Sequence, residues 1–71
     1  MVNRNLLLSQ MALKGISTKN FADAQSWSKT TAYRKINGQT AFTAPEIQKC
    51  VELLELDTQT ANDIFFNHKM S

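Results

Sequence analysis

Signals that start and stop helices recur at short intervals along this sequence. The clearest start is Thr-Ala-Pro-Glu at 43–46, where Thr43 and Glu46 have capping-box spacing and Pro45 sits in the first turn, where its missing N–H costs nothing. The other expected starts are Asn3 or Asn5, Ser17 or Thr18, Ser28, and Asp57 or Thr58, and the clearest stops are Gly15 and Gly38. No alternating, strand-like run interrupts the pattern. The sequence therefore predicts an all-α fold of five short helices.

Apolar residues within these segments recur at helical spacing and predict the core. The segment that starts at Thr43 carries one apolar stripe, made of Ile47, Cys50, Val51 and Leu54. The other inward-facing residues are expected to be Leu7, Leu8, Met11, Phe21, Ala22, Ala61, Ile64 and Phe65, with Phe66 as a further candidate in the last helix. Trp27 is expected to anchor the core, since an aromatic residue of this size contributes much of the buried area of a small domain.

The length and the cysteine content restrict the kind of protein further. A chain of 71 residues forms one domain, 1–71, with little room for a buried catalytic cleft. The single cysteine, Cys50, makes no internal disulfide, which agrees with a reducing compartment. The apolar run "LLLSQMAL" is too short to cross a bilayer and has no cleavage pattern after it. We therefore expect a cytoplasmic protein of a bacterial host cell with no membrane contact, ending in a tail at about 67–71 that includes His68.

Charge is divided unequally between the two halves of the chain. Residues 1–40 hold six lysines and arginines and one acid, whereas residues 41–71 hold two lysines and five acids. A basic half attracts a polyanion such as nucleic acid, with the acidic half facing away from it. The same asymmetry also fits short helices with solvated charges.

The most basic stretch is "SKTTAYRKING", residues 28–38, which contains no acid. A short helix, a turn of three or four residues and a second helix with donors near its N-terminal end form the helix-turn-helix layout, here at about 17–38. Lys29, Thr30 and Arg34 share one face of the second helix. Lysine and arginine donate to the guanine O6 and N7 atoms, and threonine pairs with several bases. The spacing predicts that the helix at 28–37 reads DNA in the major groove.

The segment "STKNFADAQSWSKTTAYRKING", residues 17–38, resembles the helix-turn-helix of the lambda-repressor-like family, the DNA-binding domains of phage repressors and Cro proteins. The later "FTAPEI" and "ELLELDTQTANDIFF" resemble the fourth and fifth helices of short Cro-like regulators. The resemblance implies a five-helix domain with Ala22 and Ala32 at the crossing of the two helices. It implies that Thr18 and Asn37 contact the DNA backbone. It also implies that Lys29, Thr30 and Arg34 contact the bases. We add Tyr33 and Lys35 as phosphate contacts, although Tyr33 also fits a contact with the preceding helix or with another protein.

Three residues depart from the family pattern. Ser26 stands where glycine is common, so either its left-handed conformation costs about 1 kcal/mol or the turn is different. Gln25 and Lys35 stand at positions that are commonly apolar, and Ile36 is expected to take the inward place beside Lys35.

The sequence indicates two functions. The first is a regulator of a lysis/lysogeny switch that binds double-stranded operator DNA as a homodimer, because one helix supplies too few contacts for tight specific binding. The expected dimer surface is Phe65, Phe66 and Met70. The alternative is an antirepressor that forms a heterocomplex with the phage repressor and blocks its DNA binding, with the acidic half competing for the repressor's basic helix.

An enzyme is not expected. The sequence offers no nucleophile–base pair, no metal-ligand cluster and no phosphate-cradling glycine loop. We therefore predict no catalytic residue, no metal, no cofactor and no small-molecule substrate. Cys50 is interpreted as a core residue and not as a reactive thiol.

Overall fold

The computed structural model describes residues 2–66, and within that range it contains five α-helices and no strand. The helices are α1 (Arg4–Leu13), α2 (Thr18–Gln25), α3 (Lys29–Ile36), α4 (Ala44–Leu54) and α5 (Thr58–Phe65). The all-α prediction is therefore confirmed. The predicted tail at 67–71, with His68 and Met70, lies outside the described residues.

Every helix begins at a residue predicted to cap it. The side chains of Asn3, Ser17, Ser28, Thr43 and Asp57 each accept a hydrogen bond from the backbone N–H of the third residue of their helix. At α4 the capping box is complete, since the Glu46 carboxylate accepts the Thr43 N–H in return. Each such cap contributes about 1 kcal/mol, which matters for helices of only two or three turns.

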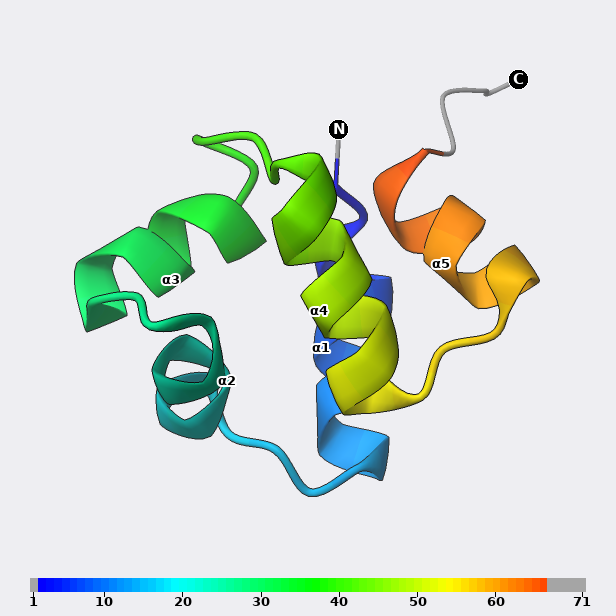
Figure 1. Ribbon diagram of the computed structural model, residues 1–71, viewed down its shortest axis with the longest axis horizontal. Coiled ribbons are helices and arrows are strands. Elements are labelled where there is room, and N and C mark those ends of the chain that lie inside the picture. The colour runs from blue at the N-terminus through cyan, green and yellow to red at the C-terminus, as the bar shows by residue number, and fades with distance from the viewer. Residues whose placement is uncertain (1, 67–71) are drawn as a thin grey trace.

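Helix α4 lies in front of α1 at the middle of the molecule, with α2 and α3 on one side and α5 on the other (Figure 1). Helix α2 packs against α3 and α4, and α1 packs against α5. The Asn3 N–H donates to the Ile64 carbonyl over 2.7 Å, which joins the start of α1 to α5. Helix α3 lies at one end of the molecule and α5 at the other (Figure 1).

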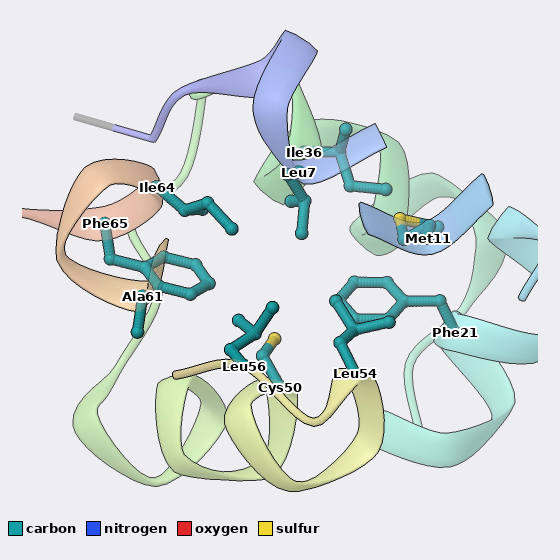
Figure 2. Packing of buried hydrophobic residues seen from close by; sticks show 10 residues of the cluster. All are labelled: Leu7, Met11, Phe21, Ile36, Cys50, Leu54, Leu56, Ala61, Ile64 and Phe65. Carbon is teal, nitrogen blue, oxygen red and sulfur yellow. The ribbon is translucent and has the colours of Figure 1, made fainter. Parts of the chain in front are cut away.

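All five helices contribute to one core, and its side chains converge in Figure 2. The predicted core residues Leu7, Met11, Phe21, Ala22, Cys50, Leu54, Ala61, Ile64 and Phe65 are confirmed as buried, and Leu8, Ile47 and Val51 are half-buried against them. Ile36 is buried, as expected. The prediction did not include Leu56, which fills the core from the connection between α4 and α5.

Trp27 is half-buried and links several elements. Its ring makes edge contacts with Phe21 and Phe42, both at 5.6 Å between centroids, and Phe42 in turn contacts Phe65 at 5.0 Å. This row of aromatic rings runs from α2 through the α3–α4 connection to α5. The prediction that Trp27 anchors the domain is confirmed.

The turn between α2 and α3 is three residues long. Ser26 adopts a left-handed conformation with φ 62°, and the Trp27 N–H donates back to the Ala22 carbonyl over 2.8 Å. This is the hydrogen-bond pattern of a Schellman helix end. The chain therefore makes the same turn that glycine would make, and Ser26 carries the steric cost of its Cβ.

Candidate functional site

The exposed side of α3 brings together most of the residues predicted to bind DNA. Lys29, Thr30, Tyr33, Arg34 and Asn37 are all exposed and follow one another at helical spacing. The opposite side, which faces the core, holds Ala32, Lys35 and Ile36. We call the first five residues the α3 face.

Among residues 2–66, the cations on and beside the α3 face have no acidic partner. Elsewhere in the described range, Lys14 pairs with Glu55, Lys19 with Asp23 and Lys35 with Glu46. Within residues 2–66, the cations without a carboxylate in salt-bridge range are Arg4, Lys29, Arg34 and Lys49. Three of these four lie on the α3 face or against it, so unneutralised positive charge is concentrated there.

Arg4 contacts the α3 face, and the sequence did not predict this contact. Its Nε donates to Asn37 Oδ1 over 2.7 Å, although the two residues are 33 positions apart. Arg4 is the first residue of α1, and Asn37 caps the C-terminal end of α3. Neither residue type nor spacing in the sequence marks this pair, because it depends on how α1 packs beside the end of α3.

Lys35 does not belong to the α3 face, which corrects its prediction as a phosphate contact. Its residue surface is 7% exposed, and its ammonium donates to Glu46 Oε1 at 2.7 Å and to the Ala41 carbonyl at 3.0 Å. The ammonium also lies 5.4 Å from the centre of the Trp27 ring. Lys35 and Ile36 both face inward, and the α3–α4 connection and the first turn of α4 each supply an oxygen acceptor for the lysine.

Glu46 is the acceptor at the centre of this partly buried polar cluster. Its carboxylate receives the Lys35 ammonium, the Thr43 N–H and, at 3.3 Å, the Trp27 indole N–H. Burial alone would raise the pKa of Glu46, but the hydrogen bonds from Lys35 and from the Thr43 backbone outweigh it and lower that pKa below its ordinary value. One carboxylate therefore joins α4 to α3 and to the α2–α3 turn.

Gln25 and Cys50 form a second polar contact in the interior. Gln25 is 9% exposed, and its Nε2 donates to the Glu46 carbonyl at 3.1 Å and to Cys50 Sγ at 3.3 Å. Burial raises the pKa of the Cys50 thiol to about 12, so the thiol stays protonated at neutral pH. The buried amide nitrogen of Gln25 is thus hydrogen-bonded, and Cys50 is a core residue as expected.

Thr18 belongs to α2 and not to the α3 face. It is the first residue of α2, half-buried, next to the cap residue Ser17. A residue in the first turn of a helix lies close to unpaired backbone N–H groups, which favours a phosphate at that end.

The predicted protein-interface residues are separated by the structure. Phe65 is 6% exposed and belongs to the core, so its prediction as a surface residue was wrong. Phe66 is 50% exposed, and Met70 lies outside the described residues. Phe66 borders two adjoining hollows of about 230 and 470 Å³, which share Phe42, Ile47 and Phe66 as lining residues. This apolar surface lies between the α3–α4 connection, α4 and α5.

From residue 2 to residue 66, no helix combines the length and the apolar character needed to cross a bilayer. Over the same residues, no three histidine, cysteine, aspartate or glutamate side chains come together where they could hold a metal ion.

The chain was compared with curated proteins and with protein-family models. No curated protein matches the chain. A family model described as "Protein of unknown function (DUF739)" matches residues 5–68, which include α2 to α5 and all of α1 except its first residue. Because this match covers most of the chain, the protein belongs to the family described as "Protein of unknown function (DUF739)".

Proposed function

We propose that this protein is a phage-type transcriptional regulator that binds operator DNA through α3, with α2 and α3 acting as a helix-turn-helix. The observation that carries the proposal is the α3 face, where Lys29 and Arg34 are exposed and have no acidic partner among residues 2–66. The resemblance of residues 17–38 to lambda-repressor-like proteins supports the same function.

The spacing on the α3 face supports major-groove recognition. Lys29 and Thr30 lie in the first turn of α3, the end of a recognition helix that contacts base edges, and Arg34 lies on the same side about one turn later. The two cations donate to guanine acceptors, and Thr30 adds a hydroxyl and a methyl group. Thr18 at the start of α2 contacts a phosphate. Tyr33, 48% exposed between the cations, adds a phenol hydroxyl beside the groove.

Two copies of the chain are needed for tight specific binding. A helix of eight residues presents only three base-reading side chains here, and a palindromic site doubles the contacts. The apolar surface around Phe66 is the candidate contact between copies. It lies between the α3–α4 connection, α4 and α5, and no residue of the α3 face lines its hollows.

The same apolar surface also favours the second candidate, an antirepressor. In this function the chain binds the phage repressor protein and blocks its DNA binding, with little specific DNA binding of its own. The half-exposed Phe66 and the hollows beside it provide an apolar contact for such a partner.

The experiment is a binding selection from a library of random duplexes, followed by fluorescence-anisotropy titration of the enriched and scrambled sequences at about 150 mM salt. Specific regulators bind their sites at least about a thousandfold tighter than other DNA. We expect an enriched palindromic sequence with this discrimination. Equal, weak binding to both duplexes would reject the operator-binding function, and purification of the chain in complex with the phage repressor would then favour the antirepressor.

A further inference from the structure

We infer that Arg4 and Asn37 together hold a phosphate of the DNA backbone at the C-terminal end of α3. This inference rests on the proposed function and extends it to a residue of α1. Neither the charge pattern of α3 nor its spacing assigns a role to Arg4.

The geometry leaves hydrogen-bond donors free and oriented. Arginine carries five N–H donors, and the Nε–H of Arg4 is the one that Asn37 Oδ1 accepts, at 2.7 Å. The four N–H groups on the Nη atoms therefore remain available. Because the Asn37 carbonyl oxygen faces Arg4, its amide nitrogen points away and offers two more donors. Within residues 2–66, no side chain accepts from any of these groups.

The pair is held by backbone that is already ordered. Arg4 is the first residue of α1, and the backbone N–H of the preceding residue, Asn3, donates a hydrogen bond to the Ile64 carbonyl. Asn37 is the C-terminal cap of α3. The side-chain contact therefore joins two fixed helix ends. A cluster whose donors are oriented before binding loses less conformational entropy when it takes a phosphate.

The electrostatics favour an anion. Asn37 is neutral, so it orients the guanidinium without cancelling its charge, as an aspartate would. By contrast, Lys14 and Lys19 are neutralised by Glu55 and Asp23. Arg4 also lies at the positive end of the α1 dipole, which offsets the negative C-terminal end of α3.

The position of the pair identifies which anion it meets. Asn37 is the last member of the α3 face, two turns after Lys29. When the N-terminal part of a recognition helix is at the base edges, its other end leaves the groove toward the sugar–phosphate backbone. Arginine donates two parallel hydrogen bonds to a phosphate, which fixes orientation as well as adding affinity. The pair would therefore set the angle at which α3 enters the groove.

The test compares two substitutions with a matched control, on the enriched and the scrambled duplex. Arg4→Met removes the positive charge of the guanidinium. Asn37→Asp keeps a hydrogen-bond acceptor for Arg4 but places a carboxylate beside the guanidinium and so cancels the positive charge of Arg4. We expect each substitution to weaken binding to both duplexes about tenfold at about 150 mM salt. Each should also lower the magnitude of the slope of log affinity against log salt by about 1. Lys49→Met removes an exposed cation from α4 and should change neither quantity. Circular dichroism melting would show that each variant is folded.

The outcomes separate this inference from the function on which it rests. If the wild type discriminates between duplexes and Arg4→Met keeps its affinity and salt slope, the phosphate contact is wrong and the operator-binding function stands. If Arg4→Met lowers the discrimination between duplexes, Arg4 reads bases and the inference is also wrong. If the selection enriches no sequence, both are overturned.

Discussion

The ammonium of Lys35 lies 2.7 Å from a carboxylate oxygen of Glu46 and so links α3 to the first turn of α4. The two side chains are 9% and 21% exposed, and the same carboxylate accepts the Trp27 indole N–H. The orientation of α3 is therefore set by a partly buried ion pair as well as by apolar packing. This cluster lies directly behind the exposed residues that we propose to bind DNA.

Substitution of Glu46 should destabilise the domain. Glu46→Gln retains the shape and the capping contact with the Thr43 N–H but leaves the Lys35 ammonium without a counter-charge. We expect a loss of about 2 to 3 kcal/mol in the free energy of unfolding, measured with urea. The control Glu52→Gln, exposed on the same helix, should change it by less than about 0.5 kcal/mol. Adding Lys35→Met to Glu46→Gln should restore part of the loss, and equal stability of Glu46→Gln and wild type would contradict the assignment.

The ion pair also predicts a dependence of stability on acid pH. The pKa of Glu46 is lower in the folded state than its ordinary value of 4.5, so the unfolded chain binds protons more readily. This contribution is complete above the ordinary pKa and is lost as the pH falls through the lower, folded-state pKa. Urea titrations from pH 7 to pH 3 should show stability falling below about pH 4.5, with a shallower fall in Glu46→Gln. If stability falls with pH in parallel in the wild type and in Glu46→Gln, Glu46 is not responsible for the loss of stability in acid.

Local chemistry made the helices predictable. Each start depends on a side chain within three residues of the N–H that it caps, and such contacts can be inferred from the sequence alone. The ends of α2 and α4 were harder, since Ser26 and Glu55 take left-handed conformations with φ 62° and 53° without being glycine. At these two positions the conformation opposes the local preference of a residue with a Cβ.

The site was only partly predictable, because its composition depends on long-range packing. The helical period places Lys29, Thr30, Arg34 and Asn37 on one side of α3 whatever surrounds it. It cannot indicate that Lys35 is buried, because its partners, the Ala41 carbonyl and Glu46, come from the next connection and the next helix. Arg4 was missed for the same reason, since its contact spans 33 positions.

Ser26 offers a direct test of the α2–α3 turn. Its φ of 62° is unfavourable for any residue with a Cβ, so Ser26→Gly should stabilise the domain by about 0.5 to 1 kcal/mol in urea unfolding. The matched control is Ser9→Gly in the exposed middle of α1, where the same change should destabilise by a similar amount. Destabilisation at both positions would mean that Ser26 is not strained.

Substitutions of the neighbouring residues Arg34 and Lys35 should affect different properties, namely DNA binding and stability. Arg34→Ala should weaken binding to the enriched duplex by about 1 to 3 kcal/mol and relax one base preference, with the melting temperature unchanged, because the Arg34 side chain is exposed. Lys35→Ala should lower the melting temperature, because it removes a buried partner of Glu46. Titrations of folded protein measure the binding, and full operator affinity in Arg34→Ala would reject that residue as a base contact.

Phe66 should control association between copies of the chain. Half of its surface is exposed beside an apolar hollow, so Phe66→Ser removes apolar contact area at the proposed dimer surface. We expect sedimentation equilibrium to show a dimer dissociation constant at least about tenfold higher than in the wild type. Binding to a palindromic duplex should weaken as well, whereas binding to a half-site should not change. Leu13→Ser is the control, because Leu13 is 75% exposed at the end of α1 and outside the residues that line the hollows. A wild type that is monomeric at all concentrations and binds half-sites and palindromes equally would exclude the dimer.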